Sequence, residues 1–147
     1  MDWKAHLTYG SIVGIIFFLC TWKFIGWFDL SLVTIITSIL IIAIYSLLAD
    51  CDHPISTITY TFFGFSIIVL LFGVFLKNDF YIYFGLAFLI FTFICAKFFK
   101  HRGPIHSLLA GAIFCLPLYF IGNEFALLAF ISFWSHLWLD KIPFKFV

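Results

Sequence analysis

The residues best suited to chemistry in this chain are histidines and aspartates near the ends of apolar segments. His136 and Asp140 are four residues apart, so on a helix they project from one face about one turn apart. Asp50 and Asp52 flank Cys51, and a proline two residues later prevents regular helix there. Imidazole and carboxylate groups together suit borderline divalent ions such as zinc, manganese or iron. The pattern therefore predicts a metal site.

A catalytic site of this kind needs protein ligands and an open position for water. A bound divalent ion lowers the pKa of its water to about 7 and polarises a carbonyl or phosphoryl oxygen. Arg102 offers a planar guanidinium that can clamp a phosphate or carboxylate through two hydrogen bonds, and Gly103 allows a substrate close to the backbone. These residue types predict hydrolysis of an ester with one or two ions, zinc being the first expectation and manganese or iron the alternatives.

Simpler interpretations of the same residues stay open. Lys100 and Arg102 could neutralise the grouped aspartates through salt bridges, with no metal. Cys51 could bind a soft metal, but no second cysteine stands near it in the sequence. Ser107 and Ser135 each stand beside a histidine. Because adjacent residues on a helix do not face one another, we expect these serines to cap helices or form hydrogen bonds.

The composition places these residues in a membrane. Of 147 residues, 65% are hydrophobic and only 10% are charged, against roughly 25% charged residues in ordinary soluble domains. A water-soluble globule is excluded because too few polar side chains exist to coat its surface. The formal net charge of +1 provides no basic face for nucleic acid. The four scattered cysteines indicate no disulfide framework.

Apolar runs long enough for transmembrane helices predict an all-α, polytopic helix bundle with about six spans. Lys and Arg collect on one side of such a bundle, which predicts that both termini are cytoplasmic. All five histidines fall on that same face, and this sorting points to a shared site. The connections are short, so residues 1–147 are expected to form a single integral membrane domain. The predicted spans are Leu7–Phe28, Leu30–Ala49, Ile58–Leu76, Phe80–Phe99, Ile105–Ile121 and Phe125–Leu139.

Four motifs resemble those of the LexA-binding inner-membrane hydrolase family, a group of bacterial and archaeal membrane-bound metal-dependent hydrolases. The motifs are AHLTYG at 5–10, ADCDHP at 49–54, HRGPIHSLLAG at 101–111 and SHLWLD at 135–140. The resemblance covers nearly the whole chain, although Ala49 stands where the family usually has proline. It implies a multi-pass protein of the cell inner membrane. The metal residues it implies are His6, Asp50, Asp52, His106, His136 and Asp140, with His53, His101 and Arg102 completing the pocket.

Together, the residues and the resemblance predict a membrane-embedded hydrolase that acts at the cytoplasmic face on a phosphoester or lipid ester. The partners expected are the lipid bilayer and a lipid or lipid-linked substrate, with no nucleic acid, and the oligomeric state is left open. Asp52 or His101 is the expected general base. One alternative is a non-enzymatic ion or metal transporter or a metal-binding membrane protein. It is disfavoured because ionisable residues gather at one face and not along the spans. Another is a regulatory anchor for a soluble protein.

Overall fold

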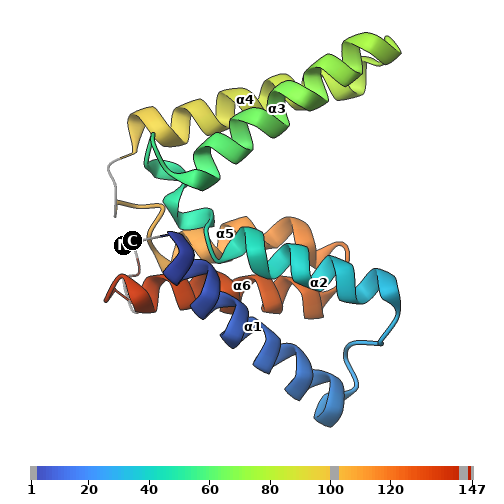
Figure 1. Cartoon of the computed structure of the whole chain (residues 1–147), viewed down its shortest axis with the longest axis vertical. Helices are drawn as coiled ribbons and strands as arrows, with labels where there is room; N and C mark the ends of the chain where they lie inside the picture. The colour runs from blue at the N-terminus through green and yellow to red at the C-terminus, as the bar shows by residue number, and fades with distance from the viewer. Residues whose placement is uncertain (1–2, 100–102, 143–145, 147) are drawn as a thin grey trace. The chain divides into compact units, whose positions relative to one another are not determined.

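The computed structural model describes residues 3–99, 103–142 and 146, and in these residues all regular structure is helical (Figure 1). The all-α expectation is therefore confirmed. The elements are α1 (Trp3–Ile25), α2 (Leu32–Tyr45), the 3-10 helix η1 (Leu48–Asp52), α3 (Thr57–Leu76), α4 (Asp79–Phe98), α5 (Leu108–Tyr119) and α6 (Asn123–Leu139).

Local capping explains where several of these helices begin. The side chains of Ser31, Ser56 and Ser107 accept hydrogen bonds from the backbone N–H groups of residues 34, 59 and 110, which begin α2, α3 and α5. At the end of α3, Lys77 takes a left-handed conformation with φ of 52°. Its neighbour Asn78 caps α4. Short polar residues between apolar runs thus set the boundaries of the helices.

The helices differ in whether they reach the length of a membrane span. α1, α3 and α4 have 23, 20 and 20 residues and are apolar enough to cross. α2 and α5 have 14 and 12 residues, or about 21 and 18 Å at the helical rise, against a hydrocarbon core of about 30 Å. The second predicted span extends to Ala49, but α2 ends at Tyr45 and the chain continues into η1. Six full crossings and cytoplasmic termini stay predictions.

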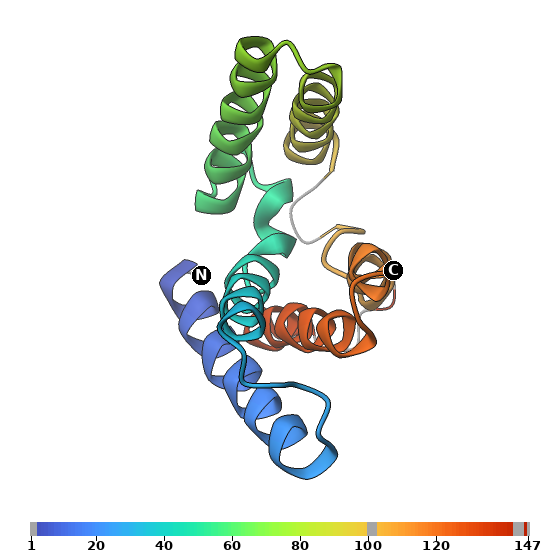
Figure 2. The ribbon, with the colours of Figure 1, turned by 90° about the vertical axis from the view of Figure 1, so that its right-hand side faces the viewer.

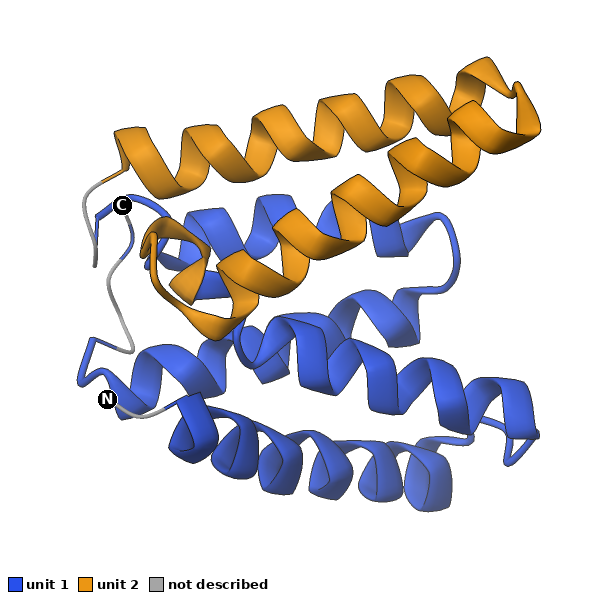
Figure 3. Ribbon diagram, turned by 45° about the horizontal axis from the view of Figure 1, so that its top comes forward, with its two compact units in different colours: residues 1–49, 103–147 blue, residues 50–102 orange. Residues whose placement is uncertain are grey.

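The chain divides into two compact units (Figure 3). Unit 1 comprises residues 1–49 and 103–147, and unit 2 comprises residues 50–102. Unit 1 contains α1, α2, α5 and α6, whereas unit 2 contains the α3–α4 hairpin. That all 147 residues form one membrane domain stays a prediction.

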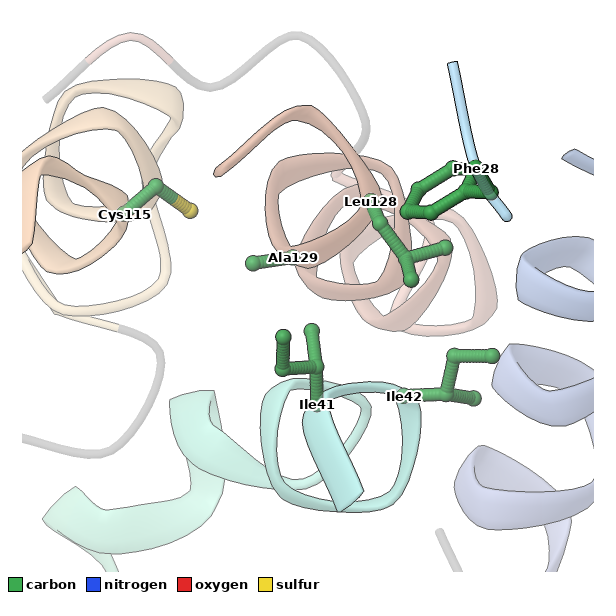
Figure 4. Close-up of a cluster of buried hydrophobic side chains, with 6 residues drawn as sticks. All are labelled: Phe28, Ile41, Ile42, Cys115, Leu128 and Ala129. Carbon is green, nitrogen blue, oxygen red and sulfur yellow. The ribbon is translucent and has the colours of Figure 1, made fainter. Parts of the chain in front are cut away.

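In unit 1, α6 is the central helix and contacts α1, α2 and α5. It lies between α1 and α5 in Figures 1 and 2. Figure 4 shows Ile41 of α2 directed toward Ala129 of α6, with Ile42 and Leu128 in the same buried cluster. Both α6 residues are fully buried. This packing holds α6 in a defined register against its neighbours, which matters because α6 carries His136. The rest of this core is Phe28 and Cys115.

In unit 2, α3 and α4 pack side by side as an antiparallel pair. Their backbones approach closely at two glycines. A Cβ added at Gly73 would lie 2.7 Å from the backbone nitrogen of Ile82, and one added at Gly85 would lie 2.7 Å from that of Leu70. Small residues that allow such close approach are common at helix interfaces in membranes. The two glycines therefore set the register of the hairpin.

Candidate metal centre

The candidate site is built around Asp140, which follows the last residue of α6. Its backbone N–H donates to the carbonyl of His136 at 3.1 Å, so the chain is still helical at this point. Lys141 then turns into the left-handed region, with φ of 62°, as residues just beyond a helix end often do. This ending holds the Asp140 carboxylate beside the last turn of α6.

Three imidazoles converge on that carboxylate. The Nε2 atoms of His106 and His136 lie 3.2 and 3.4 Å from Oδ2 of Asp140, and Nε2 of His6 lies 3.9 Å from Oδ1. All four residues are buried: His106 and His136 are 0% exposed, His6 is 2% and Asp140 is 5%. The structure thus gathers residues of unit 1 that are up to 134 positions apart in the sequence around a single carboxylate.

His136 is held in place on both sides of its ring. Its Nδ1 lies 2.8 Å from the backbone carbonyl of Ser46. A carbonyl can only accept, so Nδ1 carries the proton, and in the neutral ring the lone pair is on Nε2, which faces Asp140. The ring also stacks on His6, with centroids 3.9 Å apart and planes at 15°. Metal-binding histidines are commonly fixed by such a bond from the other ring nitrogen.

Ser46 and Gly10 support this arrangement, and sequence reasoning missed both. Ser46 follows the end of α2, where its side chain bonds to the carbonyl of Ile42 at 2.6 Å and its own carbonyl faces His136. A Cβ at Gly10 would overlap the Ser46 side chain. The close approach of α1 to this point brings His6 to the site. In the sequence, the only indication of this close approach was a glycine, Gly10, four residues after His6.

Two of the predicted positions need correction. His106 was expected on a helix that begins at Ile105, but α5 begins at Leu108 because the Ser107 side chain caps it by accepting from Ala110. His106 therefore lies in the preceding turn, where its N–H donates to the carbonyl of Gly103 at 3.1 Å.

The other corrected position is His6, which was expected before the first span but lies within α1. The expected hydrogen-bonding roles of the two serines are confirmed. Ser107 caps α5, and Ser135 donates to the carbonyl of Ser132 at 2.7 Å.

His6, His136 and Asp140 lie close enough together to fit a borderline divalent ion, and His106 lies beside Asp140. One ligand atom each from His6, His136 and Asp140 lies within 4.8 Å of the others. Tetrahedral zinc with bonds of about 2.0–2.1 Å separates neighbouring ligand atoms by about 3.3 Å. The separations of 3.2 and 3.4 Å from Asp140 to His106 and His136 are close to that value, and the 3.9 Å from His6 is slightly longer. Three imidazoles and one carboxylate are also the ligand types that zinc, manganese and iron accept in proteins.

Electrostatics keep Asp140 in the form that a metal ligand requires. Burial acts to raise the pKa of its carboxyl group, but the adjacent imidazoles of His106 and His136 act in the opposite direction and prevail. The pKa lies well below the ordinary value as a result. The carboxylate is therefore ionised at neutral pH.

The other predicted site residues lie outside the described part of unit 1. Asp50, Asp52 and His53 belong to unit 2, so their participation as ligands or base stays a prediction. His101 and Arg102 lie outside the described residues. The cluster in unit 1 consists of His6, His106, His136 and Asp140.

Cys51 has a neighbour that the sequence did not reveal. Its thiol hydrogen bonds with that of Cys95, 44 residues further along the chain and in the same unit. This hydrogen bond, together with burial, raises the pKa of the Cys51 thiol far above its ordinary value. A thiol that stays protonated at neutral pH is not ready to bind a metal.

The comparisons with known proteins address the membrane assignment. A family model described as YdjM inner membrane protein matches residues 1–144. The chain belongs to this family. It is accordingly an inner-membrane protein, in agreement with the apolar helices and with the localisation expected from its motifs. Neither the curated proteins nor the solved structures contain a match to the chain.

Proposed function

We propose that this inner-membrane protein is a metal-dependent hydrolase whose ion is held by His6, His106, His136 and Asp140. The observation that carries the proposal is the convergence of three imidazole Nε2 atoms on one buried carboxylate, with separations of 3.2, 3.4 and 3.9 Å. Buried charged groups in a membrane protein are costly and usually serve a site. The ligand types and their spacing suit zinc, with manganese or iron as alternatives.

Each residue of the cluster has a distinct role in the proposed site. Asp140 supplies the ionised carboxylate, and the Ser46 carbonyl keeps the His136 ring in the tautomer whose Nε2 faces the site. His106 is held by the turn before α5, and His6 arrives on α1. A divalent ion, when bound, supplies an activated water and polarises the bond to be cleaved. Asp52, His101 and Arg102 are proposed as base and anion clamp on the basis of their sequence motifs.

The substrate class follows from the location. A lipid headgroup reaches a membrane site by lateral diffusion, so we propose a phosphoester or other ester of a lipid or lipid-linked compound. The cationic rim that Arg102 and its neighbouring lysines would provide favours an anionic headgroup.

The proposal is tested by hydrolysis assays on protein purified in detergent and reconstituted with zinc, manganese or iron. The substrates are a panel of phospholipids, lipid-linked phosphates and carboxyl esters. Wild type and an Asp79→Asn control, which changes an exposed acid in unit 2, are expected to hydrolyse at least one class. His136→Ala is expected to be inactive while it still inserts and purifies normally. Equal activity in His136→Ala and wild type would remove the cluster from catalysis.

The alternative function of ion transport gives a different result in the same preparation. Ion flux in proteoliposomes that is abolished by His136→Ala, without hydrolysis of any substrate in the panel, would replace the hydrolase proposal with a transporter.

A further inference from the structure

A pair of buried thiols lies in unit 2, outside the metal cluster. Cys51 comes from η1 and Cys95 from the last turns of α4. They are 0% and 2% exposed, respectively, and their thiols are in hydrogen-bond contact. Neither takes part in a disulfide in the structure.

Hydrogen bonds fix the position of Cys51 relative to the start of α3. The hydroxyl of Thr59 donates to the backbone carbonyls of Cys51 and His53, at 3.3 and 2.9 Å. The hydroxyl of Ser56 donates to the carbonyl of Asp50 at 2.7 Å. The segment that carries Cys51 is therefore folded back onto the first turn of α3.

The register of the hairpin brings Cys95 to that same turn. The close contacts of Gly73 with Ile82 and of Gly85 with Leu70 define which residues of α3 and α4 lie at the same level. Continued along the antiparallel pair, this register places Cys95 level with residue 60, next to Thr59. Cys95 also lies on the buried stripe of α4 with Gly85 and Thr92. Backbone geometry thus accounts for the contact between the two thiols.

We propose that Cys51 and Cys95 are a reversible modification site, in which hydrogen peroxide converts the two thiols to a disulfide within unit 2. Disulfides require sulfur atoms that can approach to about 2.05 Å from side chains whose Cα atoms are about 4.4–6.8 Å apart. Two thiols close enough to share a hydrogen bond are candidates for this bond. Both thiols are buried, so the oxidant that reaches them must be small and uncharged. Hydrogen peroxide is uncharged and close to water in size.

The reaction balances with one peroxide molecule. Cys95, as its thiolate, attacks an oxygen of peroxide, which breaks the O–O bond, gives a sulfenic acid and releases hydroxide. The other sulfur then attacks the sulfenic sulfur, which forms the S–S bond and breaks the S–O bond. The protons of both thiols end in two molecules of water. The two sulfurs lose two electrons, and peroxide accepts them.

Formation of the bond would cross-link η1 to the end of α4. The resulting loop contains all of α3 and most of α4, and closing such a loop restricts the unfolded chain. It would also fix the backbone of the segment that carries Asp50 and Asp52. The proposal does not depend on the metal site or on hydrolysis.

The test uses the full-length protein in detergent with Cys20→Ser and Cys115→Ser, so that only the pair remains. After exposure to hydrogen peroxide, free thiols are counted by maleimide labelling in denaturant, before and after dithiothreitol, and digests are examined by mass spectrometry. We expect both thiols to be lost, a linked peptide pair containing Cys51 and Cys95, and full recovery of both thiols with dithiothreitol.

Two control variants complete the design. In a Cys51→Ser, Cys95→Ser variant, the exposed Cys20 and the buried Cys115 should form no intramolecular link under the same treatment. Cys95→Ala in the pair-only background should leave Cys51 without a partner and abolish the link, and gel filtration and circular dichroism would confirm that it remains folded. The proposal is overturned if the pair-only protein keeps both thiols after peroxide, or loses them to sulfinic acid or to links between chains.

Discussion

Unit 1 and unit 2 are both built of apolar helices whose buried hydroxyls bond to carbonyls of the same helix, but unit 1 also gathers ionisable side chains from distant parts of the chain. In unit 2, the hydroxyls of Ser66 and Thr92 bond to carbonyls four residues earlier in their own helices, at 2.6 and 2.9 Å. In unit 1, His136 reaches the carbonyl of Ser46, 90 residues away, and Asp140 collects three imidazoles. Local bonds satisfy a helix in an apolar environment. Convergent contacts between distant ionisable groups are costly to bury and indicate a site.

The largest effect is expected from removing the charge at the centre of unit 1. Asp140→Asn keeps the size of the side chain but removes the carboxylate that three histidines approach. Loss of supporting groups around a metal commonly costs 10–100-fold in affinity or activity, so loss of the ligand itself should cost more than about 100-fold in hydrolysis. Asp79→Asn in unit 2 is the matched control and should retain activity. Comparable rates in the two variants would contradict the assignment of unit 1 as the site.

Removal of the metal should lower the stability of unit 1 and leave that of unit 2 unchanged. An ion that binds only the folded state at 100 times its Kd stabilises that state by about 2.7 kcal/mol. Chelation is therefore expected to speed hydrogen exchange in α1 and at the end of α6, which carry His6 and His136. The α3–α4 hairpin, residues 57–98, should keep its protection. Mass spectrometry of exchanged peptides measures both, and uniform loss of protection across the chain would refute a site confined to unit 1.

A smaller effect is expected from the approach of α1 to the site. The added methyl of Gly10→Ala would overlap the Ser46 side chain and displace the helix that carries His6. We expect metal affinity to fall about tenfold. Gly64→Ala on α3 is the matched control, because a Cβ there meets nothing within 4 Å. Metal titration of the two variants decides the matter, and unchanged affinity in Gly10→Ala would show that His6 does not need this packing.

The smallest effect concerns a turn that both units use. Lys77 ends α3 and Lys141 follows Asp140, and both have left-handed backbones, with φ of 52° and 62°. Glycine adopts this conformation without the cost of about 1–2 kcal/mol that a side chain adds. Because glycine also gives the unfolded chain more freedom, which offsets part of the gain, Lys77→Gly and Lys141→Gly should each raise stability by up to about 1 kcal/mol. Thermal unfolding measures the gain. Lys141→Gly should also retain its metal, and loss of metal there would show that the lysine side chain takes part in the site.

The helices of both units were largely predictable from the sequence because hydropathy and capping are local. The six predicted apolar runs correspond to α1–α6, with ends that differ by at most four residues. The pairing of His136 with Asp140 followed from their spacing of four residues and appears in the structure at 3.4 Å. The sorting of all histidines to one face predicted a shared site, and in the structure His6 and His106 lie beside Asp140.

The remaining features depend on packing, for which the sequence offered little signal. The partner of His136 is a backbone carbonyl that became available because α2 ends before Ser46. The contact between Cys51 and Cys95 depends on the register of a hairpin set by two glycines. Residue types alone do not show which backbone carbonyl is left available at the end of a helix, nor the register in which two helices pack. The parts that Asp50 and Asp52 play in the site stay predictions from their motif.

The most direct test of the metal centre is the metal content of each purified chain, measured by elemental mass spectrometry. Wild type and Asp79→Asn should carry zinc, manganese or iron at close to one or two ions per chain after reconstitution. A His136→Ala, Asp140→Ala variant that purifies as the same species should carry none above background. No metal in wild type after reconstitution with each of these ions, or full retention in the double variant, would contradict a metal centre built on His6, His106, His136 and Asp140.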